Sequence, residues 1–162
     1  PVVDVLVDHL NDPATRATAS RELFLLLGRA QRGMDDHAAA IETFRAVSDE
    51  FPDDLAASSA LLELGQTYEQ IAQEMVYQSA ADVIMGAGHP CYNSNGGYND
   101  CSNDYKYVGG LATWDDLLAG TAGGDADGDG LDDPWTLVQS REDFQALMSG
   151  PTPARVLGVP NA

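Results

Sequence analysis

The sequence predicts an α/β protein in which a helical first half leads into a second half with a partial parallel sheet. Residues 1–80 contain only three of the 16 glycines, whereas residues 81–162 contain the remaining thirteen. Apolar residues in the first half recur at the three- and four-residue spacing of helices. In the second half, short helical and strand-like segments alternate, which favours parallel pairing of the strands.

The first predicted helix covers residues 15–31, and Gly33 ends it. Its apolar face consists of Leu23, Leu26, Leu27 and Ala30, with Phe24 beside them. This spacing places the side chains on one side of a helix, where they would be buried against a neighbouring element.

Two further helices are predicted in the first half. The aspartates at 35–36 can cap a helix over residues 36–50. Pro52 ends that helix, and the aspartates at 53–54 can cap a long third helix over residues 55–78.

Three short strands are predicted in the second half. Residues 82–85 form an apolar run that ends at Gly86, which is typical of a buried strand. Residues 135–138 and 155–159 are the other two candidates.

Two helices are predicted between these strands. Thr113 is expected to cap a short helix that includes Trp114 and Leu117. Ser140 is expected to cap a helix over residues 141–148. The resulting order of helix, strand, helix and strand supports an α/β segment.

The helical half carries a pattern that resembles the tetratricopeptide repeat. The matching positions are Phe24, Leu27, Gly28, Ala40, Phe44 and Pro52, followed by Leu61, Leu64, Gly65 and Tyr68. Gly28 and Gly65 are 37 residues apart, against about 34 in the family, and Gln31 stands where the repeat has tyrosine. The resemblance implies paired helices that approach closely at their small residues. A plain helical hairpin with a close-packed glycine explains the same pattern.

From Tyr68 onward the sequence resembles the alkaline phosphatase family. The matching stretches are YEQIAQEMVYQSAADVIMGAGHP at 68–90, YKYVGG at 105–110, TWDDLLAG at 113–120, PWTLVQSREDFQAL at 134–147 and PTPARVLGVPNA at 151–162. We therefore divide the chain into a helical, tetratricopeptide-like segment, 1–67, and an alkaline-phosphatase-like α/β segment, 68–162.

This second resemblance implies an exported metalloenzyme that hydrolyses phosphate monoesters. Such enzymes use two zinc ions, a magnesium ion, a serine nucleophile and an arginine. The matched stretches hold none of the family's nucleophile or zinc-ligand motifs, and His89 matches a glycine turn. We therefore assign no catalytic residue and expect this chain alone to be inactive. Zinc and magnesium are expected only where the rest of a phosphatase is present.

The charge balance restricts the classes of partner. The net charge is −18, with Lys106 as the single lysine, so nucleic acids and anionic membrane surfaces would be repelled. The sequence has no run of about 18 apolar residues, so we expect no membrane-spanning helix. The expected partner is another protein or the remainder of a larger chain, and an oligomer is possible.

The two cysteines lie in a polar loop. Cys91 and Cys101 have nine residues between them, which is not the spacing of a zinc-ligand pair. In an exported protein they would form one disulfide, and in a cytosolic protein they would be free thiols. We expect the disulfide, and with it an extracellular or periplasmic location.

An aspartate-rich loop is the one self-contained candidate for a metal site. The predicted ligands are the carboxylates of Asp125, Asp127, Asp129 and Asp133 and the backbone carbonyl of Leu131. Oxygen ligands at the first, third and fifth places, with Gly130 at the sixth, are typical of a calcium loop. Thr136 stands where an EF-hand has its bidentate glutamate, so Glu142 or Asp143 would have to complete the site. The alternative is a solvated acidic loop without an ion.

Two functions remain open from the sequence. The first is a segment of an exported alkaline-phosphatase-like phosphomonoester hydrolase, itself without nucleophile and zinc ligands but with a structural calcium loop. The second is a secreted, non-enzymatic, calcium-stabilised interaction or assembly module whose helical half binds a partner.

Overall fold

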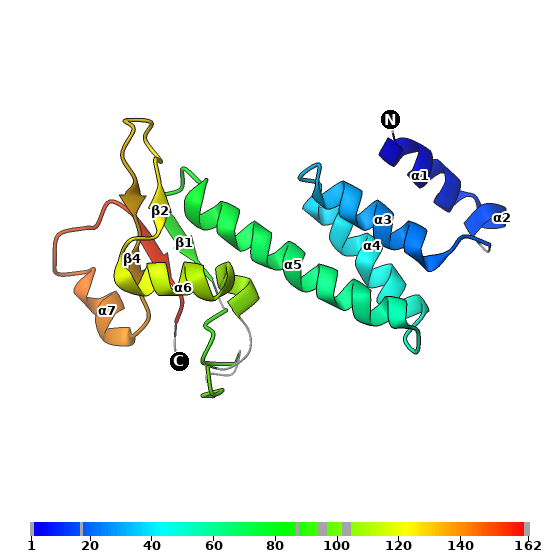
Figure 1. Cartoon of the computed structure of the whole chain (residues 1–162). Coiled ribbons are helices and arrows are strands. Elements are labelled where there is room, and N and C mark those ends of the chain that lie inside the picture. Colours follow the sequence, from blue (N-terminus) through cyan, green and yellow to red (C-terminus); the bar gives the residue numbers. More distant parts are fainter. Residues whose placement is uncertain (1, 17, 87, 94–96, 102–104, 161–162) are drawn as a thin grey trace. The chain divides into compact units, whose positions relative to one another are not determined.

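The computed structural model describes residues 2–16, 18–86, 88–93, 97–101 and 105–160 (Figure 1). The chain divides into two compact units, Pro1–Thr67 and Tyr68–Ala162. Helices are combined with a three-stranded parallel sheet, so the predicted α/β class and the helical N-terminal part are confirmed.

The first unit is helical. It contains α1 (Val2–Asn11), α2 (Pro13–Arg16), α3 (Arg21–Arg32), α4 (His37–Glu50) and the beginning of α5 (Leu55–Tyr77). The prediction of one helix over 15–31 is wrong at its start, because Thr15 belongs to the short α2 and the main helix begins at Arg21.

The buried face of α3 differs from the predicted one. Its buried residues are Phe24, Leu25, Leu27, Gly28 and Gln31. Leu26, which was expected on this face, is 51% exposed. The positions 24, 27, 28 and 31 follow a helical spacing that starts at Phe24, and Leu26 falls outside it.

The helices α3 and α4 form a hairpin with a close approach at Gly28. A Cβ atom at Gly28 would lie 2.5 Å from the ring of Phe44, which is itself fully buried. The α4 helix begins as predicted, because the Asp36 carboxylate accepts a hydrogen bond from the Ala39 amide at 3.1 Å. Asp54 similarly accepts from the Ala56 amide at 3.0 Å, at the start of α5.

The second unit is built on a parallel sheet. The strands β1 (Val83–Met85), β4 (Thr136–Val138) and β5 (Val156–Gly158) are arranged in the order β1-β5-β4. Ile84 and Leu137 both lie opposite Leu157, so the central strand β5 is in register with both neighbours. All three predicted strands are present, and their parallel pairing is confirmed.

The expectation that the strand at 82–85 is buried is wrong. Val83 is 58% exposed and Met85 is 55% exposed. Among the residues that the structure describes, β1 pairs with β5 alone, so it is an edge strand. An apolar run predicts a strand, but burial depends on which face of the strand another element covers: Ile84 packs against the core, whereas Val83 and Met85 share the opposite face.

The helices of the second unit begin in different ways. Ser140 and Asp143 form a reciprocal capping box at the start of α7 (Arg141–Ala146), which is two residues shorter than predicted. The prediction that Thr113 is an N-cap is wrong, because α6 (Gly110–Ala119) begins after Gly109, whose φ is +84°. Thr113 lies inside α6 and donates its hydroxyl to the Gly109 carbonyl at 2.7 Å.

The core of the second unit forms where the helices meet the sheet. Its buried residues are Val76, Val108, Trp114, Leu117, Ala122, Trp135, Leu157 and Val159. They come from α5, the 3₁₀ helix η1 (Tyr105–Val108), α6, the middle of β5 and the residues next to the strands. In the described parts of the chain, no helix combines the length and apolar character that a membrane span requires.

Candidate metal site and disulfide loop

The aspartate-rich loop connects two very short strands that the sequence analysis did not predict. These are β2 (Gly123–Gly124) and β3 (Asp133–Pro134), which pair antiparallel, with Gly124 opposite Asp133. A Cβ atom at Gly124 would collide with the carbonyl oxygen of Tyr77. The glycine therefore allows the base of this hairpin to lie directly against the end of α5.

Three of the five predicted metal ligands come together in the hairpin. One carboxylate oxygen from each of Asp125, Asp127 and Asp133 lies within 4.8 Å of the others. The carboxylate of Asp129 does not belong to this group. The Asp129 carboxylate instead accepts a hydrogen bond from the Leu131 amide at 2.8 Å, and Leu131 is 70% exposed.

Backbone amides orient the three grouped carboxylates. The two oxygens of Asp125 accept from the amides of Gly128 at 2.7 Å and Gly130 at 3.0 Å. Both glycines have positive φ, +81° and +88°, a conformation that side chains disfavour. Asp133 accepts from the Ala126 amide at 3.0 Å, across the base of the loop. The alternation of aspartate and glycine thus explains the local turn.

The donor set of this group consists of carboxylate oxygens, which suit a hard cation. Asp125 and Asp127 are exposed and Asp133 is half-buried, so a cation would reach them from solvent. Three like charges at this separation repel one another, because two unit charges 4 Å apart in water interact by about 1 kcal/mol. The group can therefore hold a metal ion, and an ion would relieve the repulsion.

Asp143, a predicted candidate to complete the site, has another role. Its carboxylate accepts from the Ser140 amide at 2.9 Å and from the Gln139 amide at 3.3 Å. The hydrogen bonds with Ser140, and then that with the Gln139 amide, lower the pKa of the Asp143 carboxyl below its ordinary value. The side chain is used as a helix cap, and it is not part of the group of three.

A buried arginine, which the sequence analysis missed, fixes the base of the hairpin. Arg155 is 3% exposed, and its Nη1 donates to the carbonyl oxygens of Asp133 at 3.0 Å and Gly124 at 3.4 Å. Its guanidinium carbon lies 3.7 Å from the centre of the Trp135 ring. The sequence signal for this role is that Arg155 is a single charged residue at the start of the apolar run 155–159. A charged residue in such a run is rarely buried unless other groups pair with it, so buried partners were to be expected.

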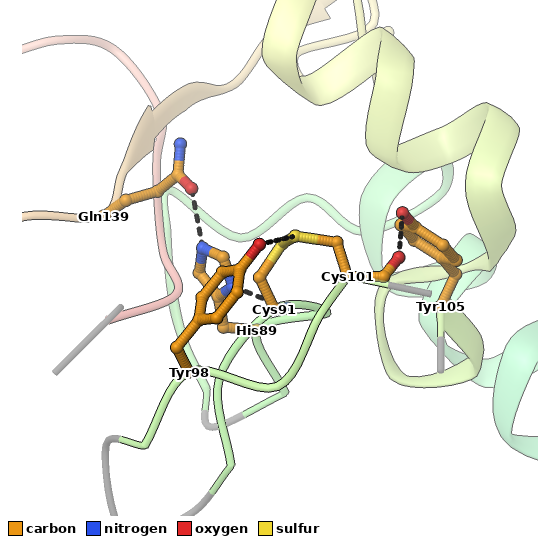
Figure 2. Close-up of a disulfide and its surroundings, with 6 residues drawn as sticks. All are labelled: His89, Cys91, Tyr98, Cys101, Tyr105 and Gln139. Carbon is orange, nitrogen blue, oxygen red and sulfur yellow. Dashed lines mark hydrogen bonds between the residues drawn. A yellow bond between two sulfur atoms is a disulfide. The ribbon is translucent and has the colours of Figure 1, made fainter. Parts of the chain in front are cut away.

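The expected disulfide between Cys91 and Cys101 is present. Figure 2 shows that Tyr98 and Tyr105 lie beside it. The Tyr105 hydroxyl donates to the Cys101 carbonyl at 2.7 Å, and the Tyr98 hydroxyl is 3.8 Å from the Cys101 sulfur. These tyrosines support the packing of the bridged loop, and the disulfide is consistent with an oxidising, extracellular environment.

His89 is held in one tautomer beside the disulfide (Figure 2). Its Nδ1 accepts from the Cys91 amide at 3.1 Å, so the proton is assigned to Nε2, which lies 2.8 Å from the side-chain oxygen of Gln139. The ring also packs in T-shaped contacts with the rings of Tyr92 and Trp114, whose centres lie 4.9 and 5.2 Å from its own. His89 therefore packs and links the loop to the end of β4. The sequence analysis did not find Gln139.

An apolar cavity of about 110 Å³ lies in the second unit. Its walls come from α5, β1, η1 and β5, with Met75, Met85 and Tyr107 among the lining side chains. No charged side chain among the described residues lines it.

Comparison of the chain with protein-family profiles, with curated proteins and with solved structures finds no match.

Proposed function

We propose that the chain is a segment of an exported alkaline-phosphatase-like phosphomonoester hydrolase, which supplies part of its sheet and outer loops. In this proposal the serine nucleophile and the zinc ligands, with their zinc and magnesium ions, belong to other parts of the protein. The sequence resemblance over 68–162 motivates it, and one structural observation supports it most. In the described residues β1 pairs with β5 alone, so it is an edge strand of the parallel sheet, and a further strand can pair with its other side.

The proposal is tested by the mass and activity of the protein isolated from its natural source. An intact mass well above 17.2 kDa, with peptides beyond residues 1 and 162 and hydrolysis of an aryl phosphate, is the expected result. The 162-residue chain with added zinc and magnesium should be inactive. A native mass of 17.2 kDa, or hydrolysis by the short chain, would contradict this assignment of the chemistry.

We further propose that the hairpin between β2 and β3 binds calcium as a structural ion. The carboxylates of Asp125, Asp127 and Asp133 supply the protein ligands, and water completes the shell. Calcium accepts six to eight oxygen ligands in flexible geometry, whereas magnesium demands a nearly ideal octahedron, so three carboxylates placed by the local turns of a loop suit calcium better. The role is structural, because the hairpin is fastened to the core through Arg155 and Trp135.

Calorimetric titration of the chelator-treated chain with calcium tests this proposal. We expect binding to the native chain and loss of binding in Asp125→Asn, which removes charge from a grouped carboxylate. Asp132→Asn is the matched control, because Asp132 is exposed in the same loop but lies outside the group of three. An absence of binding heat, or equal losses in both variants, would contradict the proposed site.

A second function is favoured by a different observation. On the part of α5 within the first unit, Leu55, Leu61 and Leu62 are 85%, 59% and 64% exposed. Exposed apolar side chains of this kind favour a secreted, calcium-stabilised interaction or assembly module whose helical half binds a protein partner. A native mass of 17.2 kDa together with calcium binding would favour this function over the phosphatase segment.

A further inference from the structure

Arg155 is a buried charge that is satisfied by carbonyl oxygens. Its Nε donates to Ala81 at 3.1 Å and its Nη2 to Ser79 at 2.7 Å, in addition to the Nη1 bonds with Gly124 and Asp133. Across the described residues, no carboxylate forms an ion pair with it. Four carbonyl dipoles and the Trp135 face therefore replace the hydration of the guanidinium.

These four carbonyls come from two separate parts of the second unit. Ser79 and Ala81 lie in the segment that enters β1, whereas Gly124 and Asp133 are opposite residues at the base of the acidic hairpin. The first β1–β5 contact lies next to Ala81, where the Val156 amide donates to the Asp82 carbonyl at 2.8 Å. One side chain thus connects the hairpin with the edge of the sheet.

Asp133 contributes both to the group of loop carboxylates and to the hydrogen bonds of Arg155. Its carboxylate belongs to the group of three in the loop, and its carbonyl accepts from Arg155. Repulsion among the loop carboxylates pushes Asp133 away from Asp125 and Asp127. Movement of Asp133 would also disturb the guanidinium and, through it, the carbonyls of Ser79 and Ala81.

We propose that Arg155 transmits the charge state of the acidic hairpin to the β1 edge of the sheet. Cations that screen or bind the loop carboxylates then slow the local opening of β1 from β5. The coupling goes beyond the calcium proposal and does not depend on it, because screening by a monovalent salt is sufficient. Arg155 is accordingly a positioning residue, which acts through the backbone of both segments.

Hydrogen–deuterium exchange on the full chain tests the coupling. Exchange is compared in about 0.01 M and about 1 M potassium chloride, where the Debye length falls from about 30 Å to about 3 Å. We expect amides in the hairpin and the Val156 amide to exchange more slowly at high salt, by about fivefold. Amides of α4, in the first unit, serve as the internal control.

Two variants separate transmission from general stability. In Arg155→Lys, amide exchange in the hairpin should still become slower at high salt, whereas exchange of the Val156 amide should slow no more than that of the α4 amides. Arg141→Lys, at an exposed position in α7, should behave as the native chain. If Arg155→Lys does not fold, the native chain still decides, because a salt response at Val156 no larger than that of the α6 amides in the same unit overturns the coupling.

The outcomes are distinct for the two proposals. Slower exchange in the hairpin without a change at Val156, or no change in either, overturns the coupling. A calcium arm at matched ionic strength reports separately on the calcium site. Extra protection with calcium supports that site, whereas equal protection contradicts it and leaves the coupling supported.

Discussion

Replacing Gly28 by alanine tests the close approach of α3 and α4. The new Cβ atom would lie 2.5, 2.6 and 2.9 Å from three ring atoms of Phe44. Because Phe44 is 0% exposed and surrounded by the core of the first unit, its ring cannot move without displacing other side chains. The helices must therefore separate, or the ring must leave its rotamer.

The size of the effect follows from two opposing contributions. Overpacking of a core costs about 1–3 kcal/mol. Alanine recovers up to about 1 kcal/mol, because it favours the helical conformation more than glycine does. We expect Gly28→Ala to lower the free energy of unfolding by about 1–2 kcal/mol.

Gly65→Ala provides a matched control in another helix of the chain. A Cβ atom at Gly65 would have no neighbour within 4 Å, so only the helical preference remains. We expect this variant to be more stable than the native chain by up to about 1 kcal/mol. Urea unfolding followed by far-ultraviolet circular dichroism measures both changes.

The two variants should thus change stability in opposite directions. If Gly28→Ala is as stable as Gly65→Ala, the close contact between Gly28 and Phe44 does not exist in solution. The packing argument for the α3–α4 hairpin would then be refuted.

Three other predictions concern charged and titrating groups. The Glu63 side chain is 8% exposed, and its carboxylate oxygens lie 2.5 Å from Nε of Arg29 and 2.7 Å from Nη2 of Arg32. Glu63→Gln removes the charge between these arginines, so it should lower the free energy of unfolding, measured by urea titration, by about 2 kcal/mol. Glu42→Gln, at a 78% exposed ion pair, should change it by less than about 0.5 kcal/mol. Because the pKa of Asp143 is lowered from 3.8, its capping contribution is present above pH 3.8 and is lost as the pH falls through the folded-state pKa. The protection of the α7 amides, relative to exchange in unstructured peptides at the same pH, should decrease over that acid range, and Asp143→Asn should remove this decrease. Burial, and after it the hydrogen bond to Asp116, raises the pKa of the Tyr77 hydroxyl above 10.0. The protonated hydroxyl therefore stabilises the folded chain fully below pH 10.0, and this contribution is lost as the pH rises through the raised folded-state pKa. Ultraviolet titration should show that Asp116→Asn lowers this pKa, and an unchanged value would contradict the role of the carboxylate.

The elements that could be predicted from the sequence are those with local causes. The starts of α4 and α5 follow from aspartate caps, and the start of α7 follows from the Ser140 capping box. The disulfide pairing was also predictable, because the chain has two cysteines. In each case the interacting groups are close in the sequence or have no alternative partner.

The features that could not be predicted depend on distant contacts. The burial of Leu25 instead of Leu26 is decided by how α3 meets α4, and the exposure of Val83 and Met85 is decided by which face of β1 packs against the core. The regular spacing of the aspartates predicted five ligands. Of the four aspartates, the structure groups Asp125, Asp127 and Asp133, whereas the Asp129 carboxylate lies outside the group. Spacing along a loop does not determine which way each carboxylate turns.

The strand order also has a consequence for how the second unit forms. The central strand β5 comes last in the sequence of the three, and Val83 must find Val156 across most of the unit. Neither β1 nor β4 can complete its pairing until residues 156–158 are available, whereas α3 and α4 are neighbours along the chain. During synthesis the helical hairpin can therefore form early, whereas the sheet forms only after its final strand is available and at a larger cost in loop-closure entropy. Pulse-labelled amides should be protected first in α4 and last in β1 and β5.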